Sequence, residues 1–182
     1  MTETHLPFDR ARATALLNDA ATGADDADLF VERTRSESFV LDDGRLKSAA
    51  FDTDQGFGLR VVAGEATGLA HAAELGESAI GRAASAAAQV KRGYEGKLDV
   101  SPTPTNRRLY AQIDPTAQPD FGAKTSLLAE IDAWARAKDP RVVQVSVSLS
   151  GARREIDILR PGGEAFHEVR PLVRLNVSVT LE

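Results

Sequence analysis

The sequence contains no cysteine, which excludes a disulfide framework and any thiolate metal ligand within its 182 residues. It also lacks the apolar run of about 20 residues that crosses a bilayer, and the opening MTETHLPFDR has no basic start followed by an apolar block. The net charge of −5 argues against a general electrostatic grip on nucleic acid. We therefore expect a cytoplasmic protein that has neither nucleic acid nor a membrane as a partner.

What the sequence does contain is typical of a globular α+β protein, with 42% hydrophobic and 27% charged residues. The first half predicts a helix at about residues 7–19, two β-hairpins and a second helix at 76–92. One hairpin, at 28–50, turns at Asp43-Gly44, and the other turns at Gly64-Glu65 and sets Phe57 opposite Ala72. The polar segment 52–56 is predicted to separate the two hairpins. These patterns predict an antiparallel β-sheet of four strands with flanking helices.

The second half begins with a segment that carries four prolines between residues 94 and 120, and this predicts an extended connector. Leu109, Tyr110 and Ile113 are its candidate anchors. A helix follows from about Phe121 to Lys138. Strict alternation then predicts a strand at 143–150 closed by Gly151, a strand at 154–160, a turn at 161–164 and a last strand at 173–181.

A connector of this length is improbable inside one compact domain, so we predict a domain boundary there. Residues 1–93 would form an N-terminal α+β domain, 94–120 the connector, and 121–182 the start of a second α+β region with about three antiparallel strands. Because the alternation of the last strand runs to the final residue, we interpret the chain as the front portion of a longer polypeptide.

The segment from Glu32 to Glu37 is unusually polar for a central strand. It predicts either an edge strand, where charge discourages unwanted pairing, or a strand that faces a solvated groove.

The sequence contains no recognisable set of catalytic residues. His167-Glu168 resembles the start of a zinc-peptidase helix, but the second histidine is missing and Pro171 would obstruct a helix. No GxSxG motif, P-loop or cysteine nucleophile is present. We therefore predict no catalytic residue and no metal ligand in this sequence.

Five polar residues are candidates for contact with a peptide or a subunit. Arg170 and Arg174 would project from one side of a strand and could clamp a carboxylate, although an acidic residue of the chain or of a partner is the simpler target. Asp54 and Gln55 precede a central strand, where a structural turn is the alternative. Arg60 lies on the mixed face of the second hairpin.

Two stretches carry a resemblance to a known family. DQGFGLRVVAGEATGLAHA, at 54–72, together with VRPLVRLNVSV, at 169–179, resembles the amino-terminal part of the TldD/PmbA proteins, in particular the TldD branch. The resemblance implies a cytoplasmic, zinc-dependent peptidase in which TldD pairs with a metal-free TldE/PmbA subunit. The pair degrades or trims unfolded peptides. An older name of the family is modulator of DNA gyrase.

The family's HExxxH helix has no counterpart here, so no catalytic or zinc-binding residue can be transferred to this sequence. The resemblance implies a noncatalytic segment that is inactive alone and supplies scaffolding, subunit contacts and one wall of a cleft. A peptide could add to an exposed strand edge, either at Glu32–Ser38 or at the last strand. The alternative function is a stand-alone protein-binding module, for example for a gyrase-related partner.

Overall fold

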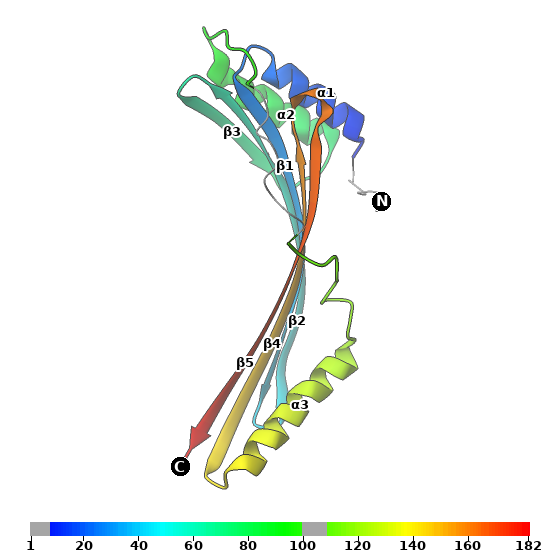
Figure 1. The fold of residues 1–182 in the computed structure, drawn as a ribbon, viewed down its shortest axis with the longest axis vertical. Helices are drawn as coiled ribbons and strands as arrows, with labels where there is room; N and C mark the ends of the chain where they lie inside the picture. The colour runs from blue at the N-terminus through cyan, green and yellow to red at the C-terminus, as the bar shows by residue number, and fades with distance from the viewer. Residues whose placement is uncertain (1–7, 100–108) are drawn as a thin grey trace. The chain divides into compact units, whose positions relative to one another are not determined.

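The computed structural model describes residues 8–99 and 109–182. Five antiparallel strands form one sheet in the order β3-β2-β1-β4-β5, and helices accompany it (Figure 1). The predicted α+β class is confirmed. Strands β1 (Asp26–Asp42), β2 (Arg45–Ala63) and β3 (Ala66–Ala72) lie in the first half of the chain, and β4 (Val142–Leu159) and β5 (Ala165–Leu181) lie in the second half.

Both predicted hairpin turns are present. Asp43 and Gly44 have positive φ angles of 52° and 69°, which a type I′ turn requires. Gly64 has a φ of 59° at the first central position of the second turn, and Phe57 pairs with Ala72 as predicted. A short 3₁₀ turn, η2 (Pro161–Gly163), joins β4 to β5 where a turn was expected.

Two predicted strand breaks are wrong. Residues 52–56 continue β2, so the first half has three strands rather than four; their polar side chains are tolerated because most of them are exposed. Gly151 lies inside β4 instead of closing a strand. A Cβ at that position would lie 3.1 Å from Glu37 Oε1, so the glycine permits a close approach to a buried carboxylate.

The chain folds into two compact units, and each of them gathers separate segments. Of the described residues, unit 1 comprises 8–33, 54–99, 109 and 155–168, and unit 2 comprises 34–53, 110–154 and 169–182. The predicted division of the sequence at residues 94–120 stays a prediction.

In unit 1, α1 (Arg10–Ala21) and α2 (Glu77–Ala87) pack against one face of the sheet. Asp9 caps α1 with its side chain, so the helix begins later than expected, and Pro7 lies outside the described residues. The 3₁₀ helix η1 (Ala88–Lys91) extends α2 where a continuous α-helix was predicted. The core of unit 1 is rich in alanine, which lets the helices approach the sheet closely.

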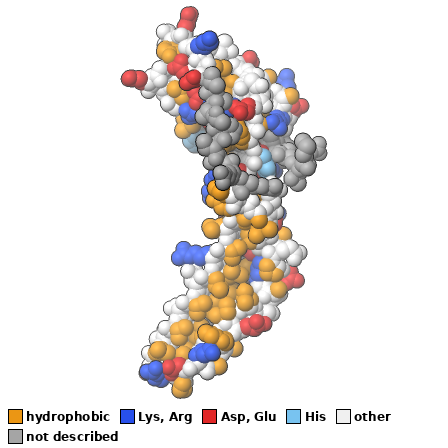
Figure 2. All heavy atoms as spheres, viewed as in Figure 1, with side chains coloured by type: hydrophobic (Ala, Val, Ile, Leu, Met, Phe, Trp, Pro, Cys, Tyr) orange, Lys and Arg blue, Asp and Glu red, His pale blue; other side chains and the backbone are white. Residues whose placement is uncertain are grey.

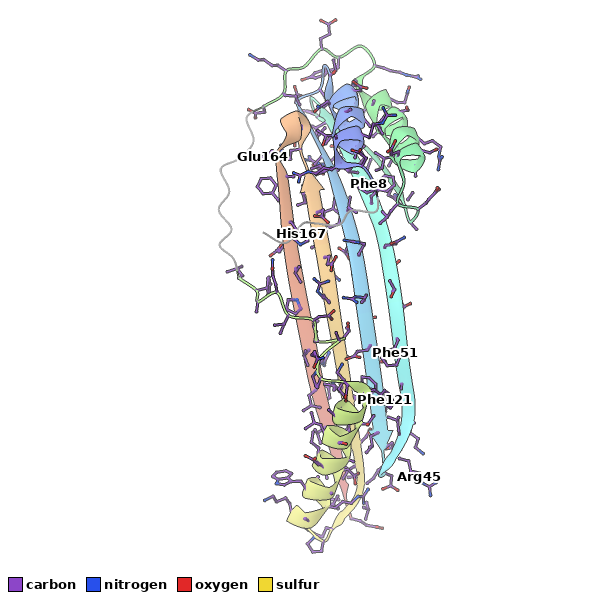
Figure 3. All side chains as sticks on the ribbon, turned by 90° about the vertical axis from the view of Figure 1, so that its right-hand side faces the viewer. Phe8, Arg45, Phe51, Phe121, Glu164 and His167 are labelled. Atoms are coloured by element: carbon purple, nitrogen blue, oxygen red, sulfur yellow. The ribbon has the colours of Figure 1, made fainter. Side chains whose placement is uncertain are left out.

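In unit 2, α3 (Phe121–Lys138) covers one face of the sheet, and its bounds are those that the sequence predicts. Asp120 caps the helix by accepting a hydrogen bond from the Ala123 amide. The core under α3 comes from the helix and from strands β1 and β4; it consists of Phe39, Leu41, Leu128, Ala135, Val145, Val147 and Leu149. Figure 3 shows Phe51 and Phe121 side by side, and both rings pack edge-on against Phe39.

In the described residues 109–120 of the connector, polar contacts take the place of the expected apolar ones. Leu109, Tyr110 and Ile113 are exposed, so the expectation that they anchor it is wrong. Instead, Asp114 accepts a hydrogen bond of 2.5 Å from Arg35, and the Lys124 ammonium donates to the Pro115 carbonyl at 2.8 Å. Charged groups provide directional contacts that apolar side chains lack.

The sheet order also decides the position of the polar segment Glu32–Ser38. It lies in β1, the middle strand, so the prediction of an edge strand is wrong, and a peptide cannot add to this segment. Strand β5 does lie at an edge of the sheet.

Candidate functional site

Four charged side chains meet on the face of the unit 1 sheet opposite α1 and α2. Arg60 Nε donates to Asp28 Oδ2 at 2.6 Å, and Arg60 Nη2 donates to Asp26 Oδ2 at 2.6 Å. Arg160 Nη2 donates to the other oxygen of Asp26 at 2.5 Å. Burial lowers the pKa of Arg60, but the hydrogen bonds and charges of Asp28 and Asp26 outweigh it and raise the pKa above its ordinary value. The Arg60 guanidinium is therefore already engaged within the chain.

Asp54 and Gln55 are exposed residues of β2, within unit 1. Asp54 Oδ1 accepts a hydrogen bond of 2.9 Å from the Gln55 amide. The alternative of a structural turn is wrong, because both residues lie inside a strand. Their role in peptide or subunit contact stays a prediction.

Arg170 and Arg174 lie on β5, within unit 2, and alternation places both on one side of the strand. Arg174 Nε donates to Asn176 Oδ1 at 3.1 Å, and Arg170 also interacts within the chain. The structure therefore places Asp54, Gln55 and Arg60 on β2 of unit 1 and the two arginines in unit 2, and it defines no common site. Their proposed contact role is untested.

Unit 2 contains a buried ion pair that the sequence analysis did not predict. Lys124 of α3 and Glu37 of β1 lie 2.5 Å apart, with side chains 4% and 2% exposed. Lys124 precedes the buried Leu128 by one helical turn, and Glu37 lies on the same face of β1 as the buried Phe39. Two opposite charges on faces that must pack together were the signal that could have revealed the pair.

His167 is oriented by a carboxylate. Its Nδ1 lies 2.8 Å from Oδ1 of Asp157, whose side chain is buried. No group of three or more His, Asp or Glu side chains that could hold a metal ion occurs within residues 8–99 and 109–182. The zinc that the resemblance implies therefore has no set of three protein ligands among the described residues.

A hollow of about 320 Å³ lies in unit 2. The residues that line it include Ser36, Ser38, Ser150, Asp52 and Leu172. This agrees with the alternative that the polar segment of β1 faces a solvated groove.

Comparison with known proteins places the chain in a family. The sequence model of "PmbA/TldA metallopeptidase domain 1" matches residues 27–90, and that of the "PmbA/TldA metallopeptidase central domain" matches residues 114–182. The chain belongs to the PmbA/TldD family. A metalloprotease TldD homolog of Haemophilus influenzae is 38% identical over 162 residues, which is 87% of this chain and 33% of that protein. A TldD homolog of Buchnera aphidicola from Schizaphis graminum is 34% identical over 160 residues, again 87% of this chain and 33% of that protein.

The fold of the PmbA/TldD family also appears among solved structures. A candidate modulator of a DNA gyrase from Thermotoga maritima superposes with a TM-score of 0.69 at 16% identity, over 94% of this chain and 42% of that protein. TldE from Thermococcus kodakarensis superposes with a TM-score of 0.60 at 14% identity, over 94% of this chain and 43% of that protein. The chain is thus homologous to TldD and spans about a third of the length of its curated relatives.

None of the described helices is long and apolar enough to span a membrane.

Proposed function

We propose that this chain is a noncatalytic portion of a TldD-like, zinc-dependent metallopeptidase subunit. The whole protein would act in the cytoplasm with a TldE/PmbA-like subunit and would degrade or trim unfolded peptides. The observation that carries the proposal is the homology to metalloprotease TldD homologs over 87% of this chain but only 33% of their length.

The proposed task of these residues is structural support and contact. In unit 2, β5 is an edge strand, and an extended peptide or a subunit could pair with its backbone while Arg174 meets a carboxylate. Asp54, Gln55, Arg60 and Arg170 complete the proposed contact residues. Arg60 would act indirectly, by holding Asp26 and Asp28 in place.

The test compares the 182-residue chain with the whole protein, each mixed with zinc and with the TldE/PmbA-like subunit. We expect the whole protein to cleave an unstructured peptide and the 182-residue chain to leave it intact. The experiment also resolves the alternative of a stand-alone protein-binding module, which the exposed edge of β5 favours. If a gyrase-related protein forms a stable complex with the 182 residues while the whole protein shows no peptidase activity, the alternative is correct.

A further inference from the structure

An uncovered apolar row runs along β5 in unit 2. Asn176 Nδ2 donates to Ser148 Oγ at 3.3 Å, so the even-numbered residues of β5 share the face of Ser148 and the odd-numbered ones share the face of Val147. That second face is the one that α3 covers, and Val147 is 0% exposed. The odd-numbered residues of β5 are nevertheless 43% to 56% exposed; they are Val173, Leu175, Val177, Val179 and Leu181.

One flank of α3 continues this apolar row. Arg136 reaches Asp43 in the β1–β2 turn, so its flank faces the β2 side of the sheet. Trp134 lies about 200° around the helix from Arg136, at about 100° per residue, and so faces the β5 side. Leu127 shares that flank, and both side chains are exposed. We name the five β5 side chains together with Leu127 and Trp134 the β5–α3 surface.

The figures agree with this placement. Figure 3 shows α3 lying along the sheet, and Figure 2 shows hydrophobic side chains gathered in the part of the view that holds α3 and the end of β5. A contiguous apolar surface of this kind on a folded protein marks an interface.

The width of the uncovered area fits one helix. Strands lie about 4.8 Å apart and a helix with its side chains is about 10 Å wide, so one helix covers about two strands. In unit 2, α3 buries side chains of β1 and β4 and leaves β5 uncovered. Unit 1 covers its own sheet with two helices, α1 and α2, that pack into one core.

We propose that an amphipathic helix lies beside α3, over β5, and buries the β5–α3 surface. This helix belongs to the same polypeptide. It lies in the part of the whole protein that corresponds to the two thirds of the curated relatives outside the alignment with this chain. The proposal shares one assumption with the proposed function, namely that the whole protein is as long as its curated relatives. To bury this surface, the helix would carry an apolar stripe along one face.

The first test is thiol labelling of two neighbouring positions, read by mass spectrometry of the peptide that contains them. Val177→Cys reports on the β5–α3 surface, and Ser178→Cys, on the opposite face of the same strand, is the matched control. Val177→Cys should react at least about tenfold more slowly in the whole protein than in the 182-residue chain, because a covered thiol is shielded from reagent. Ser178→Cys should react at similar rates in both. Peptidase activity does not enter this readout.

The second test identifies the occupant. A photo-crosslinker attached to Val177→Cys in the whole protein should mark residues spaced three or four apart in one segment beyond the aligned region. Marks spaced two apart would show a strand and overturn the helix.

Three further results would overturn the proposal. The first is equal reactivity of Val177→Cys in the short and the whole chain. The second is protection of Val177→Cys in the 182-residue chain together with a doubled mass in sedimentation, which would mean that a second copy covers the surface. The third is a reading frame that closes at residue 182, which leaves no region to supply the helix.

Discussion

At the scale of single residues, the Glu37–Lys124 pair in unit 2 has the largest expected effect on stability. Both side chains are almost fully buried, and Lys124 also holds the Pro115 carbonyl. Lys124→Met would leave the Glu37 carboxylate buried without its cation, so we expect the free energy of unfolding to fall by about 3 kcal/mol in urea titration.

The matched control is the double variant in which Lys124→Met is combined with Glu37→Gln. Removal of both charges should restore part of the loss, because the unpaired charge is the main cost. A loss below about 1 kcal/mol in the single variant would mean that water reaches Glu37.

The second residue-scale prediction concerns two glycines of the β2–β3 hairpin. A Cβ on Gly68 would run into the backbone carbonyl of Ala87 at the end of α2, whereas a Cβ on Gly58 would meet nothing within 4 Å. Gly68→Ala should therefore lower the free energy of unfolding by about 2 kcal/mol, and Gly58→Ala by less than about 0.5 kcal/mol. Equal losses in the two variants would contradict the close approach of α2 to β3.

At the scale of secondary-structure elements, the β2–β3 turn is tied to the segment that follows α2. Asp25 Oδ2 accepts from the Gly64 amide at 2.7 Å and from the Tyr94 hydroxyl at 2.6 Å. The Tyr94 hydrogen bond is the main cause that lowers the pKa of Asp25 below its ordinary value of 3.8. The same bond raises the pKa of Tyr94 above its ordinary value of 10.0.

These two pKa shifts set the pH window of the contact. The lowered pKa of Asp25 contributes stability above pH 3.8 that is lost as the pH falls through the folded-state pKa. The raised pKa of Tyr94 contributes stability below pH 10.0 that is lost as the pH rises through the folded-state pKa. Tyr94→Phe should therefore lower the melting temperature at pH 7, and its difference from wild type should shrink toward either extreme. A difference that is constant from pH 3 to pH 11 would contradict this contact.

Elements that depend on local signals were predictable from the sequence. The register of β2 and β3 follows from a two-residue turn at Gly64-Glu65, and α3 ends where Pro140 and the end of the apolar stripe require it. In both cases the deciding residues are neighbours in the sequence.

Elements that depend on distant partners were not predictable. The polar stretch of β1 resembles an edge strand, yet it lies in the middle of the sheet. Its charged side chains are accommodated there because Glu37 forms an ion pair with Lys124 of α3 and Arg33 forms one with Glu155 of β4. Gly151 resembles a strand terminator, yet it makes room for the Glu37 carboxylate. Of the candidate contact residues, the sequence could not show that Arg60 is held by Asp26 and Asp28, because no local pattern joins β1 to β2 at that position.

At the scale of the whole molecule, the proposed function assigns support and contact to these residues and catalysis to the rest of the protein. The described residues form two units, each with helices packed on strands, and they contain no group of three or more potential metal ligands. The apolar β5–α3 surface and the edge of β5 are suited to contact with other parts of the assembly. The central claim is that the reactive centre lies outside these residues.

Zinc-dependent hydrolysis by the 182-residue chain alone tests that claim most directly. The chain is incubated with an unstructured peptide in the presence of zinc and, in parallel, with a chelator. The account predicts no cleavage above the level of buffer in either sample and no tightly bound zinc after dialysis. Peptide cleavage that the chelator abolishes, together with one retained zinc ion per chain, would contradict it.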